Sequence, residues 1–229
     1  MGQEAPKRGD GPPRILVTGF PPFPTAPVNP TEHLVEMLKT RHAGLEADIH
    51  AAVIPCAYGE APDVLARLGR DIQPDIVLCF GLSRKATAFT LERIARNRCG
   101  EALADTAGQV FAEGTIRAGA AEILPSGLPL DAIRAALEAE GIPAKFSDDA
   151  GSYLCNFVFY LIIGGYIPSL APAMAGFIHV PAFETPLADT ALLFSKEILW
   201  RGACCCLRTV TDCWRNQAHL VTSTEKVHI

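Results

Sequence analysis

The sequence has few features of a secreted, membrane or nucleic-acid-binding protein. Residues 1–14 are charged and rich in Pro and Gly, without the apolar segment of a secretory signal. No run of about 18 apolar residues is present, so we expect no membrane span. Lys and Arg number 20 against 25 Asp and Glu, a net charge of −5, which disfavours binding to a phosphate backbone. The sequence therefore predicts a cytoplasmic protein with neither a nucleic-acid nor a membrane partner.

Two kinds of catalytic or metal-binding motif are also missing. No G-x-S-x-G segment is present, which disfavours a serine hydrolase of the nucleophile-elbow type. The eight cysteines form no C-x-x-C pair, although three of them are consecutive at 204–206. Adjacent side chains on a helix diverge by about 100°, so these three would ligate one ion poorly, even with Cys213 and His219 nearby. We expect reduced thiols that fill space in a C-terminal helix, and no metal.

The composition is that of a packed globular protein. Hydrophobic residues make up 49% of the 229 positions and charged residues 20%, enough for one substantial domain. We expect a flexible leader at 1–13, one domain at 14–213 and a loose tail at 214–229.

Strand-like and helix-like segments alternate along this domain. Apolar segments bounded by Gly or Pro predict strands at 14–19, 48–54, 75–81 and 174–181, and an alternating segment at 88–95 is also strand-like. Amphipathic segments predict helices that start near 30, at 60–70, at 130–140 and at 188–213. Residues 100–129 are irregular, a long excursion that in a compact domain is usually functional or mobile. This alternation predicts a single α/β domain with a largely parallel sheet.

The most informative stretch is 147–163, which begins polar, passes Gly151 and becomes continuously apolar. This pattern predicts a strand end, a tight turn and a buried helix. Cys155 falls in the opening of that helix, where the positive dipole end favours a thiolate. The position is compatible with a nucleophile and equally with an inert core cysteine.

Three further features fit a thiol site. His179 lies near the end of a predicted strand, where a lone His is usually a hydrogen-bonded core residue. Glu92 lies among apolar neighbours, either as a solvated strand residue or as a carboxylate held near a His. Phe20 and Phe23 lie on a Pro-rich loop, where they either form an apolar pocket wall or cap the core. A thiol, an imidazole and a carboxylate are together the parts of an acyl-transfer site.

Several segments together resemble type I pyroglutamyl peptidases (pyrrolidone carboxyl peptidases), a family of cysteine peptidases. They are TGFPPF at 18–23, NP at 29–30, LERIARN at 91–97, AGSYLCN at 150–156 and GFIHVP at 176–181. The resemblance covers roughly residues 14–200. It implies a single three-layer α/β/α domain with a twisted, mixed sheet, assembled as a cytoplasmic homo-oligomer (tetramer or dimer) without metal or cofactor.

The resemblance also implies roles for the candidate residues. Cys155 would be the nucleophile, His179 the general base and acid, and Glu92 the carboxylate that orients His179. Phe20 and Phe23 would sandwich the lactam ring of an N-terminal pyroglutamate, the partner being a peptide that begins with this residue. The expected reaction is hydrolysis of the following amide bond through a thioester.

The chain departs from the family pattern at two expected arginines, where it has Ala86 and Ala102. The backbone N–H of Cys155 remains for an oxyanion, and the candidate substitutes for the missing guanidiniums are Arg84, Lys85, Arg96 and Arg98. Two alternatives therefore stay open: a thiol amidase acting on another small cyclic or N-capped amide, and a binding homologue that has lost its oxyanion donors.

Overall fold

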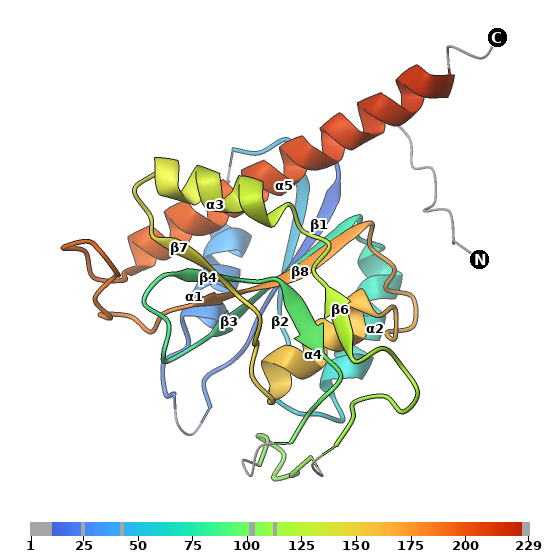
Figure 1. The fold of residues 1–229 in the computed structure, drawn as a ribbon, viewed down its shortest axis with the longest axis vertical. Coiled ribbons are helices and arrows are strands. Elements are labelled where there is room, and N and C mark those ends of the chain that lie inside the picture. The colour runs from blue at the N-terminus through green and yellow to red at the C-terminus, as the bar shows by residue number, and fades with distance from the viewer. Residues whose placement is uncertain (1–10, 24–25, 42–43, 101–103, 112–113, 226–229) are drawn as a thin grey trace.

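A six-stranded mixed sheet forms the centre of the molecule in the computed structural model, which describes residues 11–23, 26–41, 44–100, 104–111 and 114–225 (Figure 1). Its strand order is β2-β1-β3-β8-β4-β7. The strands are β1 (Arg14–Gly19), β2 (Asp48–Val53), β3 (Ile76–Leu82), β4 (Phe89–Glu92), β7 (Ala144–Ser147) and β8 (Met174–Val180). All pairings are parallel except that between β4 and β8. The predicted largely parallel, mixed sheet is confirmed.

Helices cover both faces of this sheet. The described residues form α1 (Pro30–Thr40), α2 (Ala61–Ile72), α3 (Leu130–Ala139), α4 (Leu154–Ile163) and α5 (Lys196–Glu225). Helices α1, α3 and α5 pack over one apolar cluster, and α2 and α4 over a second cluster on the other side. The expected three-layer α/β/α architecture is confirmed. No helix in the described part of the chain combines the length and apolar character needed to cross a membrane.

The segment at 88–95 differs from the prediction of one strand. It breaks at Arg93 into β4, in the main sheet, and β5 (Ile94–Arg96), which pairs with β6 (Ile123–Pro125) in a separate two-stranded sheet. The break directs the chain away from the main sheet immediately after Glu92. The sequence pattern does not reveal this break, because both strands are pleated and the alternation of side chains with a period of two continues through it.

The closing helix also differs from the predicted range of 188–213. Residues 188–195 form a loop whose Leu192 and Leu193 are exposed, and the helix begins only after Ser195, whose Oγ accepts a hydrogen bond from the Ile198 N–H at 3.3 Å. A serine at this position satisfies one of the free N–H groups of the first turn and so sets the start of the helix.

At its other end, α5 continues to Glu225, so the expected loose tail is helical as far as the structure describes it. Arg215 pairs with Glu46 at 2.7 Å, a contact that lies beyond the predicted end at Cys213. The last turns of the helix extend beyond the body of the domain (Figure 1). Most of the predicted leader, residues 1–10, lies outside the described residues.

Candidate active site

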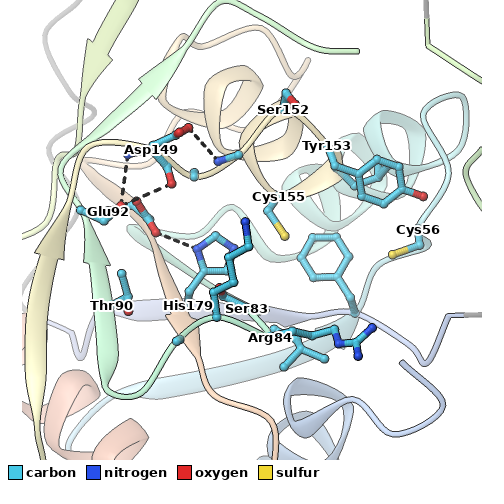
Figure 2. A pocket seen from close by; sticks show the side chains of 18 of the residues that line it. Cys56, Ser83, Arg84, Thr90, Glu92, Asp149, Ser152, Tyr153, Cys155 and His179 are labelled. Atoms are coloured by element: carbon cyan, nitrogen blue, oxygen red, sulfur yellow. Dashed lines mark hydrogen bonds and ion pairs between the residues drawn. The ribbon is translucent and has the colours of Figure 1, made fainter. Parts of the chain in front are cut away.

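A pocket of about 800 Å³ brings together the five candidate residues, Phe20, Phe23, Glu92, Cys155 and His179 (Figure 2). They come from distant parts of the sequence: the loop after β1, the end of β4, the first turn of α4 and the end of β8. The loop after β1 and the end of β8 lie at the carboxyl ends of parallel strands, the usual location of ligand sites in open α/β sheets, whereas β4 runs antiparallel to β8.

His179 and Glu92 form a buried hydrogen-bonded pair. The pairing of β4 with β8 sets Thr90 opposite His179, and Glu92 follows two residues later on the same face. His179 Nδ1 lies 2.7 Å from Glu92 Oε1, and the two side chains are 8% and 1% exposed. An ionised carboxylate only accepts hydrogen bonds, so Nδ1 carries the proton and Nε2 is left as the basic nitrogen. The structure therefore places Glu92 as the carboxylate beside a His, rather than as a solvated strand residue.

Cys155 lies in the first turn of α4, as the sequence predicted, and its side chain is half buried. The turn before the helix includes Gly151 with φ 84°, a left-handed conformation that suits glycine. The thiol packs over Gly81, since a Cβ built there would lie 3.0 Å from Cys155 Sγ. Gly81 is the register partner of His179 on the neighbouring strand. The sulfur consequently lies beside the imidazole, on the side away from Glu92 (Figure 2).

Two interactions tie the start of α4 to the segment that follows Glu92. The Asn156 side chain accepts a hydrogen bond from the Arg96 N–H at 2.9 Å and donates to the carbonyls of Arg96 and Arg98, both at 2.8 Å. Arg93 forms an ion pair with Asp148, and this hydrogen-bonded guanidinium lowers the pKa of the Asp148 carboxyl. Asn156 is fully buried, and these three hydrogen bonds satisfy its amide oxygen and both of its N–H groups.

Phe20 and Phe23 line the same pocket from the Pro-rich loop. Phe20 also packs against the ring of Phe177, with centroids 6.3 Å apart, so it belongs to the core as well as to the pocket wall. Phe23 is only half buried. The loop is held by Thr31, whose Oγ1 accepts from the Phe20 N–H at 2.9 Å.

Four cationic side chains line the pocket: Arg84, Lys85, Arg98 and Lys145. The first three were among the proposed substitutes for the missing arginines, and Lys145 was not identified from the sequence. Arg96, the fourth substitute, does not line the pocket. Its Nε donates to the Asp148 carbonyl at 3.2 Å. Ala86 is buried and lines the pocket, whereas Ala102 lies outside the described residues.

The other thiols differ from Cys155 in their surroundings. Cys56 lines the pocket but is buried, and burial, followed by the charge of Asp105, raises its pKa to about 11. Cys204, Cys205 and Cys206 lie buried on α5, where desolvation raises the pKa of each. They fill space in the core, as their spacing on a predicted C-terminal helix indicated. In the described part of the chain, no group of three or more His, Cys, Asp and Glu side chains could hold a metal ion.

An α/β domain with a thiol at a helix start, beside an imidazole bonded to a buried carboxylate, has the arrangement of a cysteine hydrolase. Residues 13–193 match the family model described as pyroglutamyl peptidase. The chain belongs to this pyroglutamyl peptidase family of cysteine peptidases.

Individual relatives and solved structures support the same assignment. The chain is 37% identical over 176 residues to the pyrrolidone-carboxylate peptidase of Pyrococcus furiosus, covering 77% of this chain and 84% of the relative. It is 38% identical over 170 residues to pyrrolidone-carboxylate peptidase 1 of Ralstonia nicotianae, covering 74% and 78%. The crystal structure of a mutant pyrrolidone carboxyl peptidase from P. furiosus superposes with a TM-score of 0.78 at 31% identity, covering 87% of this chain and 98% of that one.

Proposed function

We propose that this protein is a pyroglutamyl peptidase, which hydrolyses the amide bond after an N-terminal pyroglutamate, and that Cys155, His179 and Glu92 carry the reaction. The observation that carries the assignment of these residues is the 2.7 Å contact between His179 Nδ1 and Glu92 Oε1, next to a helix-start thiol in one pocket. A base oriented by a third group beside a nucleophile is the arrangement that thiol acyl transfer requires.

The reaction follows from this arrangement in two halves. His179 Nε2 takes the proton of Cys155, and the sulfur attacks the pyroglutamyl carbonyl carbon. The tetrahedral intermediate collapses to a thioester as His179 returns the proton to the departing amine. Water then attacks the thioester with His179 as the base, which releases pyroglutamate and the thiol. Glu92 fixes the imidazole and stabilises the imidazolium that forms in each half.

The environment of Cys155 supports stabilisation of the oxyanion. The backbone N–H of Cys155 and the positive end of α4 favour negative charge at this position. Ala86 lacks the guanidinium expected there, so we assign the remaining stabilisation to Arg84, which lines the pocket from the turn after β3. Phe20 and Phe23 supply apolar surface for the flat lactam ring.

Release of a fluorescent amine from a pyroglutamyl amide in reducing buffer tests the proposal. The wild-type protein should turn the substrate over, and Cys155→Ala should abolish turnover. The matched control is Cys213→Ala, which removes another half-buried thiol that does not line the pocket and should leave the rate unchanged. Turnover that persists in Cys155→Ala would show that another group is the nucleophile.

The buried Ala86 favours one further candidate, a thiol amidase that acts on another small cyclic or N-capped amide. This candidate predicts labelling of Cys155 by iodoacetamide with little cleavage of pyroglutamyl amides. A binding homologue would instead bind pyroglutamate and form no product. The same assay, together with calorimetric titration of pyroglutamate, separates the three outcomes.

We also propose a homo-oligomer, a dimer or tetramer, located in the cytoplasm. All eight cysteines are free, which fits a reducing compartment. Leu192 and Leu193 are 45% and 47% exposed in the loop before α5 and offer apolar surface for a subunit contact. Light scattering after size exclusion should give a mass above that of a monomer, and replacement of both leucines by Ser should lower it.

A further inference from the structure

The charge of the pocket is opposite to that of the protein as a whole. The chain carries a net charge of −5, yet Arg84, Lys85, Arg98 and Lys145 line the pocket against only two acids, Glu92 and Asp149. Glu92 is engaged by His179, and Asp149 pairs with Arg98 at 3.3 Å. Lys85 and Lys145 form no ion pair with any residue that the structure describes. A cleft with an excess of one charge concentrates ligands of the opposite charge.

The strand order gives this charge a direction relative to the scissile bond. From β1 the order runs β3, β8, β4, β7, so Phe20, just after β1, and Lys145, on β7, lie on opposite sides of His179. Lys145 is the register partner of Thr90, which in turn lies opposite His179. Two strand spacings, roughly 10 Å, therefore separate the backbones at Lys145 and His179.

The position of Lys85 is also fixed by the sheet. The Ser83 N–H donates to the Val180 carbonyl at 3.0 Å, and the Ala86 N–H donates to the Ser83 carbonyl at 3.0 Å. These bonds pin the turn that carries Lys85 to the residue directly after His179. The exposed side chain of Lys85 therefore starts next to the reacting centre, and that of Lys145 farther along the pocket.

We infer that the pocket selects pyroglutamyl peptides that carry a carboxylate immediately beyond the scissile bond, with Lys145 and Lys85 as the groups that bind it. This inference rests on the proposed function. With the lactam ring between Phe20 and Phe23 and its carbonyl at Cys155, the leaving peptide runs past His179 toward β7 and Lys145. The carboxylate comes either from an acidic side chain in the second residue or from the C-terminus of a dipeptide.

The experiment compares kcat/KM for matched peptides at low ionic strength. The side-chain arm uses pyroglutamyl-Glu-Ala-amide against pyroglutamyl-Gln-Ala-amide, and the terminal arm uses pyroglutamyl-Ala with a free against an amidated C-terminus. An exposed ion pair contributes modestly, so we expect the acid to be preferred by about two- to fivefold in at least one arm. The preference should shrink in 0.5 M NaCl, where charges are screened over a few Å. The arm that shows it identifies the source of the carboxylate.

Variants connect the preference to Lys145. Lys145→Gln should lower the Glu/Gln or free/amidated ratio by at least about twofold, and Lys145→Glu should bring it below one. The control is Lys39→Gln, which removes an exposed lysine on α1, away from the pocket, and should leave the ratio unchanged. Two results would overturn this inference but leave the proposed function intact. The first is equal kcat/KM for the neutral and acidic peptides, and the second is a preference for the acid that survives Lys145→Glu. No turnover of any pyroglutamyl peptide would overturn the proposed function with it.

Discussion

Gly81 offers the sharpest test of how the fold positions the thiol. It lies in the buried part of β3, opposite His179. Because it is a glycine, no side chain fills the space between this point of the sheet and α4. A Cβ added at this position would lie 2.6 Å from the Phe177 ring and 3.0 Å from Cys155 Sγ, and both distances are shorter than ordinary van der Waals contacts. Gly81→Ala should therefore displace one of the two groups.

The surroundings indicate that the thiol moves. Phe177 is fully buried and packs against the rings of Phe20, Phe159 and His179, so it has little room to yield. Overpacking of this kind costs about 1–3 kcal/mol of folding free energy. A displacement of the nucleophile by a fraction of an ångström to 1 Å should lower kcat by roughly tenfold to a hundredfold. KM should change less, because Phe20 and Phe23, the proposed binding surface for the lactam ring, remain in place.

The assay is steady-state hydrolysis of a pyroglutamyl amide, with thermal unfolding measured alongside. Gly176→Ala is the matched control. Gly176 lies on β8 and faces the opposite side of the sheet, where an added Cβ would lie 2.5 Å from Ser126 Oγ and 2.6 Å from the Leu128 side chain. It should lose comparable stability and retain kcat. If Gly81→Ala keeps the wild-type kcat while its stability falls, the thiol does not depend on the space over Gly81 and our placement of it is wrong.

Three further outcomes follow from the site. Glu92→Gln keeps a hydrogen-bond acceptor for His179 but removes the buried charge, so kcat should fall on the order of 10²- to 10⁴-fold in the amide assay. The circular dichroism spectrum should stay unchanged, and a fall in kcat below threefold would contradict the proposed role of Glu92. Burial raises the pKa of Cys56 to about 11, so near pH 8 only about one thiol in a thousand is ionised. Peptide mapping should therefore show that the rate of Cys56 labelling by iodoacetamide rises about tenfold per pH unit. Cys56→Ala should keep most of the activity that Cys155→Ala loses. The lowered pKa of Asp148 means that its pairing with Arg93 stabilises the fold fully above the ordinary value of 3.8 and ceases to do so as the pH falls through the lowered value. Asp148→Asn should accordingly have a lower melting temperature than wild type at pH 7, and this difference should shrink steadily as the pH is lowered below 3.8. A difference that stays constant with pH would exclude the ion pair as the cause.

The parts of the fold that the sequence predicted well are those that local patterns determine. The strand β3 is a continuous apolar run between Pro74 and Gly81, and α4 follows a polar turn with a glycine, so both follow from patterning alone. Cys155 was placed at a helix start for the same reason. The start of α5 was predicted wrongly because Leu192 and Leu193 resemble a helical apolar face, although both are exposed in a loop.

Tertiary pairing determines what the sequence alone left open. Glu92 was compatible with two environments, because the antiparallel pairing of β4 with β8, which brings it to His179, joins residues 87 positions apart. Lys145 had no local signal, since it lies on a four-residue edge strand whose position depends on β4. The family resemblance supplied the roles of Cys155, His179 and Glu92, and the structure adds the geometry that makes those roles possible.

The break in the chain at Arg93 explains how Cys155 and Glu92 are placed relative to each other. Had β4 continued in the main sheet, the backbone groups of Arg96 and Arg98 would be used by ladder hydrogen bonds. Because the chain leaves the sheet after Glu92, these groups are available to Asn156, the residue next to Cys155. The segment that fixes Glu92 against His179 therefore also anchors the helix that carries the thiol. Both ends of the proposed catalytic arrangement are thus held by a single stretch of backbone, residues 92–98.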